Sequence, residues 1–253
     1  MHAHYPVLFE HAEALWRSEV EAFIAFDLAR FAREGLRFHG AELAVEAEVP
    51  LARGAALLRA EEIALDLLGA AADGVPVLPI VGVFDRVVTD AAGSWLISDY
   101  KTAGNLDRQV DPGSYLTARD CQAPLYVLLA EAGGAPAGAR SELLGVGPDF
   151  LPEGGAARTG EVPLDAEAFE FARAGFEETL GVLAAAARRG RFPFSTGGHC
   201  DYCEYAQACR RYHYPSRVRV EGHEEYASYF ATQAKTRTRP TLADVRARQE
   251  SES

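Results

Sequence analysis

The sequence predicts an α/β fold with one main domain. Apolar residues recur at near-helical spacing in segments near both ends of the chain, and between them lie segments that alternate or run apolar as strands do. The central part is predicted to run helix, strands, helix, strand. The chain has 253 residues, of which 48% are hydrophobic, and this is enough to bury one full core.

The first elements are expected to be helical and then extended. From Leu8 to Arg33 apolar residues recur at near-helical spacing among charged ones, which predicts one or two helices. Residues Glu42 to Leu51 alternate apolar and polar side chains with the period of a half-buried strand. A short strand is expected near Ile63 to Leu68, before an Ala-Asp-Gly turn.

Two apolar runs then predict an antiparallel hairpin. Val75 to Val88 is rich in Val and Ile, and Trp95 to Tyr100 is the second run. The residues between them, Thr89 to Ser94, supply a turn.

The remaining elements alternate between helix and strand. After a polar loop around residues 105–113, Ala118 to Ala130 is expected to be helical and Ser141 to Val146 to be a further strand. Between Asp165 and Arg189 apolar residues recur every three or four positions, which predicts one amphipathic helix. Residues 216–253 are highly charged, so we expect a weakly packed tail there.

Composition excludes several classes of protein. The formal net charge of −12 argues against a generally basic protein that coats nucleic acid, because many phosphates require surplus Lys and Arg. No run of about 18 apolar residues occurs, and the N-terminus lacks the charged and apolar regions of a signal peptide. We therefore expect a soluble, cytoplasmic protein without a membrane partner.

Two carboxylates and a lysine are expected to converge at the hairpin. Asp85 and Asp99 lie at the ends of its two strands. Because strand side chains alternate, Asp99 and Lys101 point to one face and Tyr100 to the other. Carboxylates are suitable ligands for Mg²⁺ or Mn²⁺, which would activate a water that Lys101 holds or helps to deprotonate.

A simpler interpretation is that these charges form ion pairs. Asp85 would then pair with Arg86 or Lys101, and Asp99 with Lys101 on an exposed strand face, where such pairs stabilise little. The position of the charges at the ends of strongly apolar strands favours a site.

Gln122 and Tyr126 are four residues apart, so on a helix they share one face. They could contact the same phosphate or Lys101. The alternative is a capping amide and a core tyrosine.

Three motifs in this order resemble the RecB-type branch of the PD-(D/E)XK nucleases. They are Gly-x-x-Asp-Arg at 82–86, Asp-Tyr-Lys-Thr at 99–102 and Gln-x-x-x-Tyr at 122–126. This branch includes the nuclease domains of AddAB-like recombination enzymes and the CRISPR adaptation nucleases. The resemblance covers roughly Glu42 to Arg211.

The resemblance implies a restriction-endonuclease-like core, a mixed central sheet flanked by helices, over residues 1–215. It implies a metal-dependent DNA exonuclease or end-processing enzyme of repair or recombination that acts on single-stranded DNA or DNA ends, often beside a helicase. It assigns metal ligands (Asp85, Asp99 and the Tyr100 carbonyl), a catalytic lysine (Lys101) and the helical motif beside the site (Gln122 and Tyr126). An early helix of the family adds a His or Glu, for which His11, Glu13 and Glu19 are candidates by location.

Three of the four cysteines, Cys200, Cys203 and Cys209, form a C-x2-C-x5-C cluster that suggests metal more than disulfides. The cluster resembles the C-terminal part of the iron–sulfur staple of these nucleases, which implies a [4Fe–4S] cluster with a structural role. The fourth ligand is not identified, because no cysteine precedes Cys121, which we expect to be a small buried residue. A chain without metal, or a Cys3His zinc site completed by a nearby histidine (His199 or His213), are the alternatives.

Two non-enzymatic interpretations remain beside the nuclease. One is an inactive nuclease-fold scaffold or DNA-binding domain of a helicase–nuclease complex, and the other is a zinc-binding domain that contacts proteins. The acidic charge and the unplaced early ligand favour these alternatives, whereas intact Asp85, Asp99 and Lys101 favour the enzyme.

Overall fold

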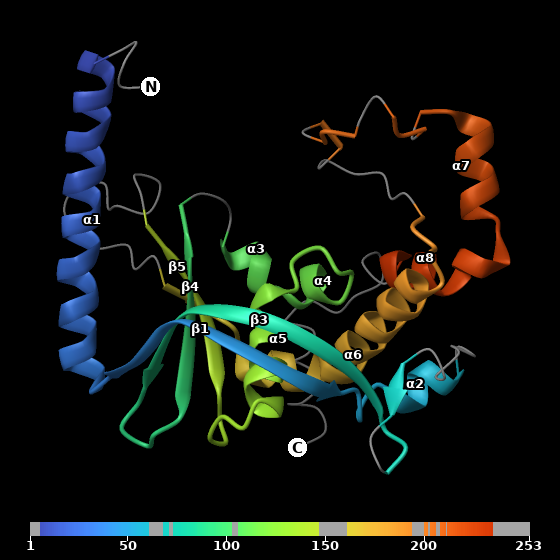
Figure 1. Ribbon diagram of the computed structural model, residues 1–253, viewed down its shortest axis with the longest axis horizontal. Helices are drawn as coiled ribbons and strands as arrows, with labels where there is room; N and C mark the ends of the chain where they lie inside the picture. Colours follow the sequence, from blue (N-terminus) through green and yellow to red (C-terminus); the bar gives the residue numbers. More distant parts are fainter. Residues whose placement is uncertain are drawn as a thin grey trace, which may run out of the picture. The chain divides into compact units, whose positions relative to one another are not determined.

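A mixed sheet forms the centre of the fold, and helices flank it (Figure 1). Its main path has the order β1-β3-β4-β5-β6, and β2 pairs with β3. The neighbours β3 and β4 are antiparallel, β4 and β5 are parallel, and β5 and β6 are antiparallel. The strands are β1 (Arg37–Pro50), β2 (Gly69–Ala70), β3 (Pro76–Thr89), β4 (Trp95–Lys101), β5 (Arg140–Gly145) and β6 (Glu161–Pro163). This is the predicted α/β, restriction-endonuclease-like architecture.

The structure is a computed structural model. It describes residues 6–60, 68–70, 73–102, 106–146, 161–193, 200–201, 203–205, 208–210 and 212–234. The helices are α1 (Pro6–Glu34), α2 (Ala55–Ala60), α3 (Leu106–Val110), α4 (Pro112–Tyr115), α5 (Gln122–Ala132), α6 (Ala166–Arg188), α7 (Tyr214–Glu221) and α8 (Ala227–Ala234), with a 3-10 turn at Glu224–Tyr226. None of these helices is both long and apolar enough to cross a membrane.

The chain divides into two compact units, each made of several segments. Unit 1 comprises Met1–Val49, Pro79–Asp111 and Asp120–Phe169, and unit 2 comprises Pro50–Leu78, Pro112–Arg119 and Glu170–Ser253. The expected boundary at residue 215 stays a prediction. The predicted weakly packed tail begins at residue 216, within α7 (Tyr214–Glu221), and includes α8, in which the side chain of Thr232 is buried.

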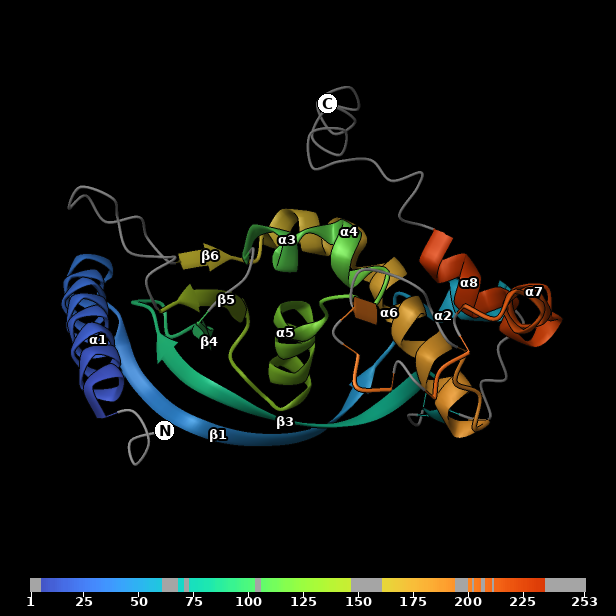
Figure 2. The same ribbon diagram turned by 90° about the horizontal axis from the view of Figure 1, so that it is seen from above.

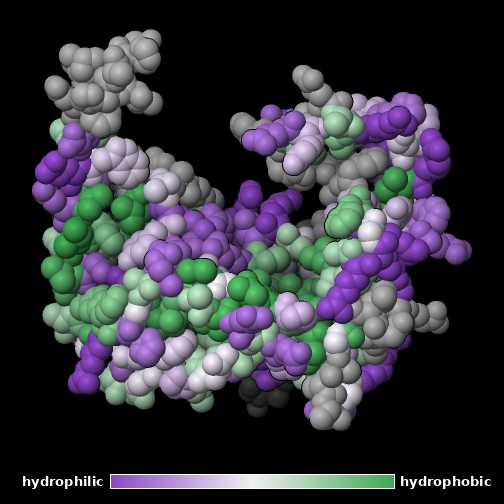
Figure 3. All heavy atoms as spheres, in the orientation of Figure 1, coloured by the Kyte–Doolittle hydropathy of each residue, from purple (hydrophilic) through white to green (hydrophobic). Residues whose placement is uncertain are grey.

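Helices α1 and α5 lie on opposite sides of the sheet in unit 1 (Figure 2). On the α1 side, Leu36, Val88 and Leu96 form a small core against which Phe31 packs. Apolar side chains also lie along the outward side of α1 (Figure 3). The exposed large apolar residues of this helix are Leu15, Trp16, Val20, Ile24 and Leu28.

The predicted hairpin is confirmed. Its register runs from the pair Thr89 and Trp95 to the pair Arg86 and Ser98. The helix expected from Ala118 starts only at Gln122, because Ala118 has a φ of 57°, a left-handed backbone conformation that no α-helix contains.

The expected short strand and the expected polar loop also need comment. Residues 61–67, which carry most of the strand expected near Ile63 to Leu68, lie outside the described residues, and the strand that follows is β2. The polar loop around residues 105–113 contains the short helices α3 and α4.

In unit 2, a carboxylate of α6 is hydrogen-bonded to the backbone that precedes α2. The buried Glu177 carboxylate accepts hydrogen bonds from the backbone N–H groups of Arg53 and Gly54, at 2.7 and 2.9 Å. A Cβ at Gly54 would lie 2.7 Å from the backbone nitrogen of Glu178, so a side chain there would displace this contact.

Candidate active site

The end of β4 and the start of α5 carry three polar side chains in mutual contact. Lys101 Nζ donates to Gln122 Oε1 at 2.7 Å and forms an ion pair with Asp99 Oδ2 at 2.5 Å. Gln122 Nε2 donates to Asp99 Oδ1, also at 2.5 Å. The amide of Gln122 therefore bridges the lysine and the carboxylate, and it does not cap the helix.

Tyr126 supports this arrangement from the next turn of α5. Its hydroxyl accepts from Gln122 Nε2 at 2.7 Å and donates to the backbone carbonyl of Val83 at 3.2 Å. Its ring meets the ring of Phe84 edge-on, with centroids 5.0 Å apart. Tyr126 thus ties α5 to β3, so the tyrosine is buried and also part of the polar cluster.

Asp85 joins the cluster from β3. Its Oδ2 accepts a hydrogen bond from the backbone N–H of Tyr100 at 3.1 Å. The charge of Asp85 also acts on Asp99 and Tyr126, where it raises the pKa of both groups. Arg86, one of the two partners that the simpler interpretation offered for Asp85, pairs with Asp27 of α1 instead.

Strand β4 presents its residues as the alternation predicts. Asp99 and Lys101 face α5, where they contact Gln122. The ring of Tyr100 faces α1 instead, with its centroid 5.8 Å from that of Phe23.

Asp99 is buried beside the charges of Lys101 and Asp85. The residue is only 3% exposed, and this burial raises the pKa of its carboxyl above the usual value. The hydrogen bond and charge of Lys101 lower the pKa, and the charge of Asp85 raises it again, with the net direction upward. Burial is the largest of these effects.

The residues present fit a Mg²⁺ or Mn²⁺ ion. Such ions are held by one or two carboxylates and keep several waters, so two aspartates and a main-chain carbonyl are a sufficient set. Within the ranges described above, no three His, Cys, Asp or Glu side chains form a group that could hold a metal ion. The site therefore rests on two convergent carboxylates, Asp85 and Asp99.

A buried carboxylate on α1 is a further candidate. Glu19 is 2% exposed, and neither of its carboxylate oxygens has a hydrogen-bond partner among the described residues. It lies one helical turn before Phe23, on the side of α1 that faces the sheet. Of the other early candidates, Glu13 pairs with Arg17 on an exposed face, and the side chain of His11 lies outside the described residues.

The chain uses lysine sparingly. Lys101 and Lys235 are the two lysines among 25 basic residues. Lysine is a compact ammonium donor whose pKa shifts readily, whereas arginine stays charged and planar. This composition is a signal that sequence reasoning overlooked, since Lys101 is one of the two positions at which the chain has lysine and not arginine.

The cysteine cluster has no metal geometry in the described residues. None of the four cysteines forms a disulfide in the structure. Near Cys209 the backbone turns, since its N–H donates to the carbonyl of Tyr205 at 2.8 Å. His213 contacts the hydroxyl of Ser216 through Nδ1, at 2.7 Å, and His199 lies outside the described residues.

Cys121 precedes α5 as its N-cap residue. Burial and the nearby charge of Asp120 raise the pKa of its thiol to about 11. Burial and this charge therefore disfavour the thiolate form of Cys121, which is the form that binds a metal.

Comparison with known proteins identifies the family. No curated protein matches the chain significantly. A profile of the PD-(D/E)XK nuclease superfamily matches residues 3–210, which include the hairpin, α5 and the cysteine segment. This match spans most of the chain and agrees with the mixed, helix-flanked sheet, so the chain belongs to the PD-(D/E)XK nuclease superfamily.

Proposed function

We propose that the chain is a divalent-metal-dependent DNA nuclease that hydrolyses phosphodiester bonds. Asp85, Asp99 and the main-chain carbonyl of Tyr100 hold Mg²⁺ or Mn²⁺. When bound, the cation acidifies the attacking water and offsets charge on the phosphate. Glu19, on the α1 side of the sheet, does not group with these carboxylates in the described residues and is not assigned to the cation.

Lys101 acts on the attacking water. An ammonium group has three donors, of which one is directed to Gln122 and one to Asp99. The third has no partner among the described residues, so it orients the water, and the charge offsets negative charge that develops on the phosphate. Gln122 and Tyr126 keep Lys101 and Asp99 in place.

One observation carries the proposal: the amide of Gln122 donates to Asp99 and accepts from Lys101. A simple ion pair on an exposed strand needs no such bridge and gains little from it. A bridge of this kind holds a carboxylate and an ammonium group at a fixed separation, which a catalytic pair requires.

The narrower assignment is to the RecB-type branch. The order of the three motifs and the cysteine spacing support a role as an exonuclease or end-processing enzyme in repair or recombination, beside a helicase, with a [4Fe–4S] cluster on Cys200, Cys203 and Cys209. The iron and sulfide content of protein purified without oxygen tests the cluster. Zinc in place of iron would favour the Cys3His alternative.

The decisive experiment is degradation of end-labelled single- and double-stranded DNA in Mg²⁺ or Mn²⁺, with a chelator as the blank. We expect metal-dependent cleavage that falls at least about a hundredfold in Lys101→Ala. Lys101→Arg is the matched control, because it keeps the charge but not the compact ammonium group. We expect it to be inactive, whereas a mere ion-pair role would leave it active.

The second candidate is a nuclease-fold scaffold or DNA-binding domain without activity. The net charge of −12 favours the scaffold over the enzyme, since an acidic chain gains little from phosphate contacts. Absence of cleavage with every metal, together with DNA binding that survives in Lys101→Ala, would support this candidate.

A further inference from the structure

The regular alternation of β3 breaks at Asp85. Phe84 contacts Tyr126 on α5, but Arg86, two residues later, pairs with Asp27 on α1. In a regular strand two such residues would share a face. Arg86 is also where the paired register with β4 ends, opposite Ser98. Asp85 therefore lies just past the ladder with β4, where pairing with that strand no longer constrains the backbone.

Arg86 contacts several elements on the α1 side of the sheet. Its Nη1 reaches Asp27 at 2.5 Å, and its Nη2 donates to the hydroxyl of Ser98 at 3.3 Å. The guanidinium carbon lies 5.4 Å from the ring centroid of Phe31 and 5.5 Å from that of Tyr100. This one buried side chain thus holds α1, β3 and β4 together.

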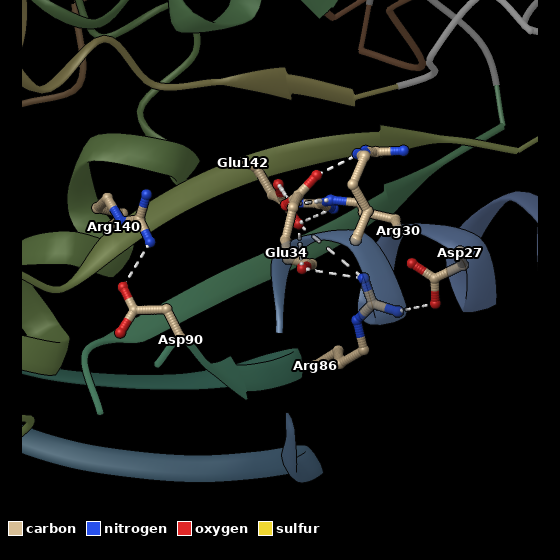
Figure 4. A network of polar contacts seen from close by, with 9 residues as sticks. Asp27, Arg30, Glu34, Arg86, Asp90, Arg140 and Glu142 are labelled. Atoms are coloured by element: carbon tan, nitrogen blue, oxygen red, sulfur yellow. Dashed lines mark hydrogen bonds and ion pairs between the residues drawn. The ribbon is translucent and has the colours of Figure 1, made fainter. Parts of the chain in front are cut away.

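A larger polar network continues from Ser98 (Figure 4). The hydroxyl of Ser98 donates a hydrogen bond to the Glu142 carboxylate at 2.6 Å. The same carboxylate accepts hydrogen bonds from both terminal nitrogens of Arg30, at 2.9 and 2.8 Å. The chain of contacts runs from α1 through β3 and β4 to β5 and back to α1. It lies on the face of the sheet opposite Lys101 and Gln122.

The network adjoins both carboxylates of the site through the backbone. Arg86 directly follows Asp85, and Ser98 directly precedes Asp99. The hydrogen bond between Arg86 and Ser98 is therefore the cross-strand contact next to the two ligands. Mg²⁺ demands near-ideal octahedral geometry, so a small shift between the strands would change its binding.

The pairing of Arg86 is not well suited to stability alone. Arg86 Nε and Asp27 Oδ1 are buried and have no hydrogen-bond partner in the part of the chain that the structure describes. A buried ion pair that leaves some of its polar atoms without hydrogen bonds stabilises the fold little more than apolar residues of the same volume would. The pair of Arg86 and Asp27 is better explained by a role in holding β3 and β4 in place beside the two aspartates.

We infer that Arg86, held by Asp27 and Ser98, is a positioning residue that sets the separation of Asp85 and Asp99. This rests on the metal site of the proposed function. Arg86 does not touch the cation or the phosphate, since its side chain lies on the α1 face. Its role is to fix the two strand ends at the separation that the cation requires.

The test is a calorimetric titration of the full chain with Mn²⁺ alone. Arg86→Met by itself would leave the Asp27 charge buried without its partner. The main variant is therefore the double substitution Asp27→Leu/Arg86→Met, which removes both charges. We expect it to unfold in urea near the wild-type midpoint but to bind Mn²⁺ about ten- to a hundredfold more weakly. A purely structural role would leave Mn²⁺ binding within twofold of wild type, and that result would overturn the inference.

Two milder variants keep the test decisive if the double variant does not fold. Arg86→Lys keeps the charge with fewer donors, and Ser98→Ala removes only the hydroxyl. Both should bind Mn²⁺ several-fold more weakly than wild type, and unchanged binding in both would overturn the inference. Arg140→Met is the control, because it breaks a surface pair with Asp90 on the same sheet and should leave binding unchanged.

The titration distinguishes failure of the proposed function from failure of the positioning role. If the wild-type chain binds no Mn²⁺, the metal site and the inference built on it both fall. If wild type binds Mn²⁺ and Asp85→Ala does not, the site stands, and the Arg86 variants alone decide the positioning role.

Discussion

Gln122 is the residue on which the proposed chemistry depends most, apart from the ligands and the lysine. Its amide is the shared partner of Lys101, Asp99 and Tyr126. Gln122→Leu should lower kcat for DNA cleavage about tenfold to a hundredfold, because Lys101 loses the group that orients it. Mn²⁺ affinity should change less, because Asp85 and Asp99 are intact.

Steady-state kinetics with a Mn²⁺ titration separates the two effects. Tyr126→Phe is the milder companion, since it removes only the hydroxyl that links Gln122 to Val83. We expect a smaller loss of kcat than for Gln122→Leu. An unchanged kcat in Gln122→Leu would show that the bridge has no catalytic role.

Asp99 gives a prediction for stability. Burial raises its pKa above 3.8, so the folded chain binds this proton more tightly than the unfolded chain does. The contribution of this group to the free energy of unfolding is therefore lost as the pH rises from 3.8 through the raised pKa. At neutral pH the charged carboxylate is net destabilising without metal.

Asp99→Asn should then melt at a higher temperature than wild type at pH 7 in chelator. The difference in Tm should shrink as the pH falls through the raised pKa and vanish below 3.8. Mn²⁺ should raise the Tm of wild type and not that of the variant. A variant that melts lower at neutral pH would refute this picture of Asp99.

At the scale of elements, one buried ion pair docks α1 on the sheet. Arg30 and Glu142 are each 1% exposed and make two parallel hydrogen bonds. Arg30→Met should lower the free energy of unfolding by about 3–5 kcal/mol, because it leaves the Glu142 charge buried without its partner.

Urea unfolding followed by circular dichroism measures this loss. The matched double variant Arg30→Met/Glu142→Leu removes both charges and should recover most of the stability. Equal losses in the single and double variants would mean that packing, and not charge, docks α1.

The hairpin was predictable at this scale because its signals are local. Apolar runs with a turn between them predict β3 and β4 whatever the rest of the chain does, and β5 was expected within one residue of its bounds. The start of α5 was not predictable, since the left-handed backbone of Ala118 is set by its surroundings. The side chains of α1 gave no clear amphipathic face, because apolar residues lie on its outward side too.

For the whole molecule, the sequence predicted which chemical groups meet but not what supports them. Asp99, Lys101, Gln122 and Tyr126 are in contact as their spacing indicated, and Asp85 lies beside them. The network on the opposite face was not foreseen, because charged residues such as Arg30 and Glu142 usually lie in solvent. The residues of this network are far apart in sequence, so no local sequence pattern predicts that they pair.

The division into two units was also not predictable from sequence. Each unit gathers segments from distant parts of the chain, and the residues of the candidate site all belong to unit 1. Hydrophobic periodicity identifies single elements, but it does not say which elements share a core.

The most direct measurement is a Mn²⁺ titration of the wild-type chain, Asp85→Ala and Asp99→Ala by calorimetry. Asp107→Ala, at an exposed carboxylate of α3, is the control. We predict that wild type and the control bind Mn²⁺ alike and that both site variants lose binding. Unchanged binding in Asp85→Ala and Asp99→Ala would contradict the assignment of the metal ligands, and with it the proposed nuclease site.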